Sequence, residues 1–186
     1  MVDHIYLIDS DVFITAKNQY YFFNICPGFW KSLIHHHTEG SIFSIDQVHK
    51  ELLTGKATDP LVRWMNNEVP KKFFLSTKVE QIIEAYEKII LWVTENPQYF
   101  DQAKQNFATS ADGWLVAHAI FKATIVITNE KSSLKSEKSI KLPDVCNQFG
   151  VRWKTHFSCS KLSTFNLIGV NLSDNSRYQK YHLDLA

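Results

Sequence analysis

The sequence predicts an α/β fold, a three-layer α/β/α sandwich with a central, mainly parallel sheet. Short apolar or β-branched runs alternate with segments of helical periodicity along the chain. Strands that alternate with helices connect through right-handed crossovers, which produce a parallel sheet covered by helices. The length of 186 residues and the hydrophobic fraction of 45% fit one domain with a substantial core.

Five short segments are predicted to be strands. Most of their residues are apolar or β-branched, and the first and fourth are followed closely by an acidic residue. The predicted strands are residues 5–8, 41–45, 72–75, 123–128 and 151–153.

Helices in the first half of the chain are predicted from caps and breakers. Pro27 is expected to begin a helix that ends before Gly40. Ser44, with Gln47 three residues later, is interpreted as a capping box, and Gly55 ends the helix that it begins. A further helix is predicted from residue 60 to about residue 67.

The clearest helix is predicted to begin at Thr77, because apolar residues then recur every three or four positions up to Val93. Ser110 is expected to cap a later helix, and Gly150 to close the last short one. The remaining predicted helices are residues 99–107 and 143–149.

Four acidic residues stand in contexts that point to one site. Asp9 directly follows the first predicted strand, and Glu130 follows the fourth. Glu51 and Asp112 lie on predicted helices. In an α/β fold such residues converge at the carboxyl edge of the sheet, where ligands bind. Clustered acids repel one another unless cations bind them, so we expect a divalent-metal site, which typically serves phosphodiester hydrolysis.

Each acid also has an ordinary interpretation. Asp9 could cap a helix that starts near Val12, and Asp112 could simply favour a helix dipole. The spacing of Asp112 from the apolar positions that follow it favours an inward-facing side chain. Glu51 alone would be a solvent-facing helix residue, and Glu130 an ordinary loop acid. Only its relation to the other acids favours a functional role for Glu51. Glu130 is favoured by Thr128, whose hydroxyl could orient a metal-bound water or a neighbouring carboxylate.

Neighbouring polar residues are candidates for supporting roles. Ser10 and Thr128 could orient the metal ligands. Asp11 could be a ligand, a group that holds a water molecule, or a cap. Asp144 could compensate the dipole of its short helix or lie at the rim of the same cleft.

The charge pattern limits how the protein could hold a polyanion. The formal net charge is +1, so bulk charge does not attract nucleic acid, and a local patch or metal ions must do so. A lysine-rich segment follows Glu130, and its residues could contact RNA phosphates or form a solvated loop. Its candidate RNA-contacting residues are Lys131, Lys135 and Lys138.

The cysteine and histidine residues do not form the pattern of a structural zinc site or of a disulfide scaffold. Three cysteines at long spacings and the absence of a signal-like start predict a cytoplasmic protein with reduced thiols. No apolar run approaches the roughly 18 residues that a membrane helix needs. The run of His35, His36 and His37 is interpreted as a polar helix end, because adjacent helical residues point in different directions.

The acids fall within four short motifs. They are Leu7-Ile8-Asp9-Ser10, Val48-x-x-Glu51-Leu52, Ala111-Asp112-x-x-Leu115-Val116-Ala117-x-Ala119 and Ile127-Thr128-Asn129-Glu130. In this order they resemble the PIN-domain nucleases, and especially the VapC-like toxin branch. The resemblance spans roughly residues 5–153, so we expect a PIN-like domain at 1–157. Residues 158–186 would then be a peripheral helix or hairpin, a partner-binding tail, or non-native sequence.

The resemblance implies a metal-dependent ribonuclease. It implies that Asp9, Glu51, Asp112 and Glu130 bind one or two Mg²⁺ or Mn²⁺ ions and carry the catalysis. It further implies an RNA substrate, a cognate antitoxin protein as partner of a toxin, and a homodimer.

Two rival functions fit parts of the same pattern. A catalytically silent PIN-like module would bind RNA or protein without cutting, but such modules usually lose one or two acids. The first motif also resembles haloacid-dehalogenase-type phosphatases, in which Asp9 would be the nucleophile and Asp11 the general acid. Those enzymes need a later paired-acid segment, which the residues after Thr128 do not supply.

Overall fold

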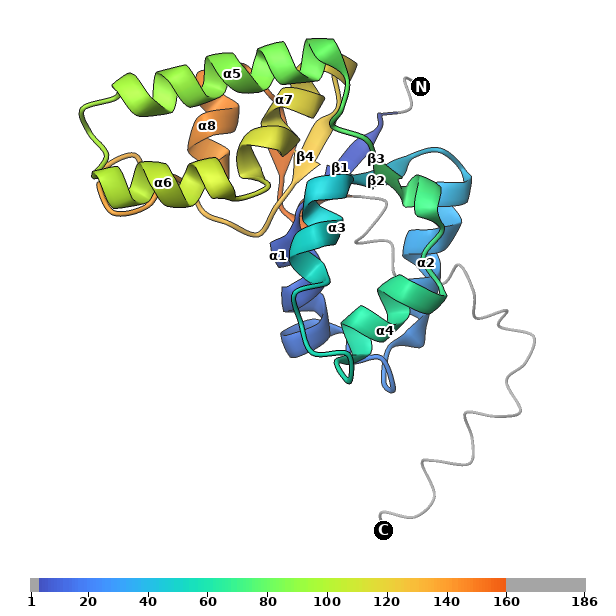
Figure 1. Ribbon diagram of the computed structural model, residues 1–186. Coiled ribbons are helices and arrows are strands. Elements are labelled where there is room, and N and C mark those ends of the chain that lie inside the picture. Colours follow the sequence, from blue (N-terminus) through green and yellow to red (C-terminus); the bar gives the residue numbers. More distant parts are fainter. Residues whose placement is uncertain (1–3, 160–186) are drawn as a thin grey trace, which may run out of the picture.

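A five-stranded, all-parallel sheet forms the centre of the protein, which confirms the predicted fold class (Figure 1). The computed structural model describes residues 4–159. The strand order across the sheet is β3-β2-β1-β4-β5. The strands are β1 (Tyr6–Ile8), β2 (Ile42–Ile45), β3 (Phe74–Leu75), β4 (Ile125–Ile127) and β5 (Trp153–Lys154).

Helices cover both faces of this sheet. The α-helices are α1 (Ser10–Thr15), α2 (Pro27–Thr38), α3 (Asp46–Leu52), α4 (Pro60–Asn67), α5 (Glu80–Glu95), α6 (Asp101–Thr109), α7 (Asp112–Lys122) and α8 (Leu142–Gln148). Three short helices of other types are η1 (Ala16–Tyr20), η2 (Lys71–Phe73) and η3 (His156–Ser158). In Figure 1, α5 to α8 lie on one side of the sheet and α2 on the other, while α1, α3 and α4 lie beyond the carboxyl ends of the strands.

The central strand determines where the site forms. All three residues of β1 are buried, because the strand has neighbours on both edges and helices on both faces. Ile8 pairs with Ile127 of β4, and the backbone N–H of Asp9 donates to the Ile127 carbonyl over 3.0 Å. This register places Asp9 beside Thr128, the residue that follows β4.

The predicted capping box at Ser44 is wrong. Ser44 lies inside β2, and its hydroxyl donates to the Ile8 carbonyl over 2.6 Å, so it joins two strands instead of capping α3. Ile45 precedes α3 and makes no side-chain cap, while Gln47 donates to Thr77 over 3.3 Å. A serine whose hydroxyl bonds a buried strand carbonyl cannot be distinguished, in the local sequence, from a serine that caps a helix.

Thr77 does not begin the long helix as predicted. Its hydroxyl donates to the Asp46 carboxylate over 2.7 Å, which ties the chain after β3 to the start of α3. Helix α5 begins three residues later, at Glu80, and Ile83 on its predicted apolar stripe is 39% exposed.

Helices α5 and α7 pack closely at Gly113. A Cβ atom at this position would lie 2.9 Å from a ring carbon of Tyr86, and the Tyr86 ring stacks on Trp114 at a centroid distance of 3.7 Å. Helix α7 begins at Asp112, two residues after the predicted cap at Ser110. The close packing fixes the first turn of α7, and with it the position of Asp112.

Two predictions concern the chain as a whole. Within residues 4–159, every helix is too short or too polar to cross a membrane. The expected domain boundary after residue 157 falls inside η3, and Cys159 beyond it is buried. The rest of the predicted tail, residues 160–186, lies outside the described part of the chain.

Candidate functional site

Five carboxylates lie together at the carboxyl edge of the sheet. Asp9 and Glu130 follow β1 and β4, which are neighbours in the sheet. Asp11, Glu51 and Asp112 belong to α1, α3 and α7, which start at or extend from the same edge. The structure therefore brings together all four acids named as ligands, and it adds Asp11 to them.

The acids lie close enough together to change the pKa values of Asp112 and Asp9. Burial raises the pKa of Asp112 to about 7, and repulsion from Glu130, Glu51 and Asp11 adds to the rise. Burial also raises the pKa of Asp9 well above its usual range, with further repulsion from Asp112 and Asp11. Repulsion of this kind requires that the carboxylates share one small region of low dielectric.

Asp9 is the most buried member, with only 3% of its surface exposed. One carboxylate oxygen accepts from the Ser10 backbone N–H over 2.6 Å, and the other accepts from the Thr128 hydroxyl over 2.9 Å. Asp9 therefore caps α1, as its ordinary interpretation expected, and also stands at the centre of the acidic cluster. Ser10 and Thr128 hold its orientation.

Asp11 is held by a residue that sequence reasoning missed. The backbone N–H of Asn129 donates to both oxygens of Asp11, each over 3.1 Å. The Asn129 side-chain oxygen accepts from Nδ1 of His156, which is 2% exposed. Burial lowers the pKa of His156, so this imidazole is neutral near pH 7. Asn129 lies within the fourth motif, but only the fold brings it together with His156, which no local motif marks.

Glu51 and Asp112 meet where α3 approaches the start of α7. One oxygen of Glu51 accepts from the backbone N–H of Ala111 over 2.7 Å. Glu51 therefore positions the start of α7. The second carboxylate oxygen of Glu51 accepts no hydrogen bond from residues 4–159. Within the described chain, neither carboxylate oxygen of Asp112 accepts a hydrogen bond.

Glu130 has a different environment from the other acids. Its Oε1 pairs with Lys141 over 3.0 Å, and its Oε2 accepts from the Leu142 backbone N–H over 2.8 Å. The charge of Lys141 also lowers the pKa of Asp112. Lys141 ends the lysine-rich segment that follows Glu130, and the turn into α8 places it beside the acids.

Asp144 and the lysine-rich segment form a separate arrangement. Asp144 accepts hydrogen bonds from the Ser132 hydroxyl and the Ser133 backbone, so it holds this segment and makes no described hydrogen bond to the acidic cluster. Gln98 and Phe100 donate to the backbone carbonyls of residues 134, 136 and 137, which ties the segment to the α5–α6 connection. The candidate RNA-contacting residues on it are all exposed: Lys131, Lys135 and Lys138.

One family of proteins matches most of this chain. It is described as a domain of unknown function (DUF4411), and the match covers residues 6–166. The chain belongs to the DUF4411 family. No curated protein matches it. The matched range contains β1 to β5 and all five carboxylates, so the site described above lies within the DUF4411 domain.

The histidine run of this DUF4411 domain is more than a polar helix end. His37 turns away and its Nδ1 bonds the Ile42 carbonyl, as expected for residues that point in different directions. His35 and His36, however, converge with Glu39, and one ligand atom of each lies within 4.8 Å of the others. Both imidazoles reach the Glu39 carboxylate, at 3.5 Å and 3.1 Å. The acidic cluster contains no three carboxylate oxygens that come so close together in the described chain.

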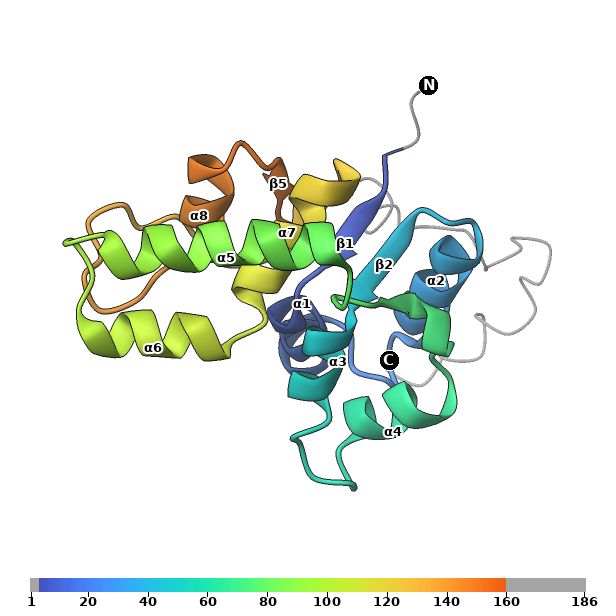
Figure 2. The same cartoon turned by 45° about the horizontal axis from the view of Figure 1, so that its top comes forward.

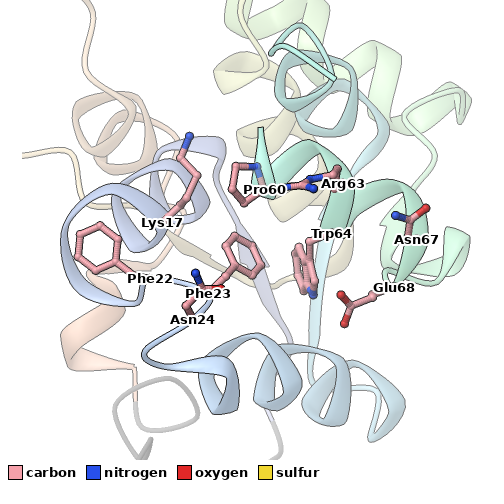
Figure 3. A pocket seen from close by; sticks show the side chains of 9 residues that line it. All are labelled: Lys17, Phe22, Phe23, Asn24, Pro60, Arg63, Trp64, Asn67 and Glu68. Carbon is pink, nitrogen blue, oxygen red and sulfur yellow. The ribbon is translucent and has the colours of Figure 1, made fainter. Parts of the chain in front are cut away.

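The DUF4411 domain also contains a cavity of about 440 Å³ between the end of η1 and α4 (Figure 3). Two cationic side chains, Lys17 and Arg63, lie on its walls, and Lys17 is paired with Asp59 over 2.7 Å. The other lining residues are Phe22, Phe23, Asn24, Pro60, Trp64, Asn67 and Glu68. None of the five carboxylates lines it, so the cavity is distinct from the acidic cluster.

Proposed function

We propose that this protein is a divalent-metal-dependent ribonuclease that hydrolyses RNA phosphodiesters at the acidic cluster. The observation that supports this proposal best is the convergence of five carboxylates from four separate segments around the buried Asp9, at the carboxyl edge of a parallel sheet. Unpaired buried carboxylates are costly, and a protein retains such an arrangement when cations compensate it.

The donor set fits Mg²⁺ or Mn²⁺. Carboxylate oxygens are the ligands that hard divalent cations prefer. The Cys146 thiol lies near Asp112 and Asp9, but burial and these two carboxylates raise its pKa, so it stays protonated and does not compete as a ligand. The carboxylates are spread more widely than the 4.8 Å that groups His35, His36 and Glu39. Mg²⁺ keeps several waters and takes one or two carboxylates directly, which suits a cluster of this width.

Each side chain has a role in this proposal. Asp9 and Asp112 hold the ion, and Thr128 keeps the Asp9 carboxylate in place. The second oxygen of Glu51 accepts a proton from the attacking water, because its first oxygen is fixed by Ala111. When bound, a divalent ion polarises a phosphoryl oxygen and stabilises the charge that develops on it.

The cavity of Figure 3 is the proposed continuation of the RNA path. Asp11 and Lys17 are six residues apart along α1 and η1, so the cavity begins between one and two helical turns from the cluster. Phe22 is 47% exposed and offers a face for base stacking, and the exposed Arg63 offers a phosphate contact. Lys131 is exposed and follows Glu130 in the chain, so it offers a further phosphate contact.

The test is cleavage of a mixed cellular RNA pool with Mn²⁺ or with EDTA. Wild-type protein is compared with Asp9→Asn, which removes the central charge but keeps an acceptor for Ser10. Asp101→Asn is the matched control, because Asp101 is exposed at the start of α6 and lies outside the cluster. We expect Mn²⁺-dependent cutting by the wild type and the control, and almost none by Asp9→Asn. Full activity of Asp9→Asn would contradict the proposal.

A folded wild type that neither cuts nor binds Mn²⁺ would favour the silent RNA- or protein-binding module. The toxin role is a further part of the proposal, and it rests on the resemblance to VapC-like proteins. It predicts that induced expression in bacteria arrests growth and that Asp9→Asn does not. The same cells would then serve to isolate the antitoxin that relieves the arrest.

A further inference from the structure

Glu130 differs from the other four acids because its carboxylate pairs with a cationic side chain of the described chain. Oε1 pairs with Lys141 and Oε2 accepts from the backbone N–H of Leu142, over 3.0 Å and 2.8 Å. Leu142 is the first residue of α8, so Glu130 satisfies a backbone donor that a helix start leaves free. A metal cation that took Glu130 as a ligand would have to compete with the Lys141 ammonium group for the same carboxylate.

Lys141 pairs with Glu130 and lies near enough to Asp112 for its charge to act on that carboxylate. It is partly buried, and its charge acts on Asp112 in α7 as well as on Glu130. Its charge lowers the pKa of Asp112, against the repulsion from Glu130, Glu51 and Asp11. The ammonium group therefore already compensates part of the negative charge that would draw in a second ion.

We propose that Glu130 is an anchor and not a metal ligand, and that Lys141 is a built-in cation of the site. The site then takes one divalent ion, held by Asp9 and Asp112 with Glu51 and Asp11 beside them, instead of two. The Lys141 ammonium supplies the second positive charge and faces the substrate phosphate. This inference rests on the proposed metal-dependent function.

The side-chain length of Glu130 explains the arrangement. Glu130 follows β4 by three residues, and its longer side chain reaches across to the turn before α8. Thr128 fixes this reach, because its hydroxyl accepts from the Glu130 backbone N–H over 3.1 Å while it donates to Asp9. The same threonine therefore couples the anchor to the metal-facing carboxylate.

The experiment is a calorimetric Mg²⁺ titration of the full chain without RNA. Mg²⁺ is chosen because it disfavours the imidazole ligands His35 and His36. Wild type is compared with Lys141→Met and with the matched control Lys138→Met, which removes the same charge from an exposed position on the same segment. A His35→Gln variant checks that no ion is counted at the histidine group.

We expect one Mg²⁺ per wild-type chain. Lys141→Met should bind Mg²⁺ more tightly, by about tenfold, or take a second ion, because the carboxylates lose their internal counter-charge. The same variant should cleave RNA more slowly, a combination that simple structural damage would not produce. Lys138→Met should match the wild type in the titration.

Two ions in the wild type would overturn the inference, and this measurement needs no variant to fold. Unchanged or weaker binding by Lys141→Met, relative to Lys138→Met, would also overturn it. Either result leaves the proposed ribonuclease intact. No Mg²⁺ binding by a folded wild type would instead remove the metal site itself, and the proposed function with it.

Discussion

The stability of the metal-free protein should fall as the pH rises, because its folded state resists ionisation of Asp112. The folded-state pKa of Asp112 is about 7, against 3.8 for the isolated side chain. A raised folded-state pKa favours the protonated acid, so this contribution to stability is fully present below pH 3.8 and is lost as the pH rises through about 7.

The size of this effect follows from the linkage relation. Between pH 5.5 and the folded-state pKa of about 7, the free energy of unfolding falls by about 1.4 kcal/mol per pH unit. The contribution of Asp112 between pH 5.5 and pH 8 is therefore about 2 kcal/mol. For a chain of this size that corresponds to roughly 4–8 °C in melting temperature. Asp9 and Asp11 act in the same direction, since burial raises their pKa values too.

The assay is urea unfolding in EDTA at pH 5.5 and pH 8, for wild type and Asp112→Asn. The variant is needed because three histidines have pKa values lowered by burial and oppose the trend below pH 6.5; they are His49, His118 and His156. We expect the variant to lose about 2 kcal/mol of the pH-dependent difference, and Mg²⁺ to stabilise wild type more at pH 8 than at pH 5.5. Equal pH dependence of the two proteins would refute the reasoning about the cluster.

Three further predictions concern packing, site support and substrate contact. Gly113→Ala should lower the free energy of unfolding by about 1–3 kcal/mol in urea, because its Cβ would meet the Tyr86 ring at 2.9 Å; an unchanged midpoint would show that the ring moves freely. His156→Ala should cost about 2–4 kcal/mol in the same assay, since it leaves a cavity and an unpaired Asn129 side chain. Arg63→Ala should raise the KM for RNA several-fold and leave kcat nearly unchanged, and an effect on kcat alone would argue against the cavity as part of the RNA path.

The local sequence predicted the strands of this fold well. Runs such as residues 5–8 and 123–128 are apolar on both faces, and only a strand between two layers of helices requires that. The errors arose where polar side chains make contacts distant in sequence. Ser44 and Thr77 look like helix caps, but their hydroxyls bond Ile8 and Asp46 of other elements.

Asp9, Asp112 and Glu130 were predictable because each follows or begins an element at the same edge of the sheet. Glu51 lies near the end of α3, and only its relation to the other acids pointed to it. Their environments were not predictable in the same way. Asp11 and Glu130 both appeared as acids of uncertain weight, and the structure separates them: Asn129 holds the first, while Lys141 pairs with the second. The partner residues lie 118 and 11 positions away, and no local pattern connects them.

The sequence by itself therefore determined the α/β class and the succession of strands and helices along the chain, because hydrophobic periodicity is a local property. It also indicated that Asp9, Glu51, Asp112 and Glu130 gather at one edge of the sheet. Only the tertiary structure decided how the charges are balanced. The pKa of Asp112 depends on burial and on three neighbouring carboxylates, and the position of Lys141 depends on the turn into α8. Electrostatic energies depend on distances and dielectric environment in space, which the order of residues in the chain does not specify.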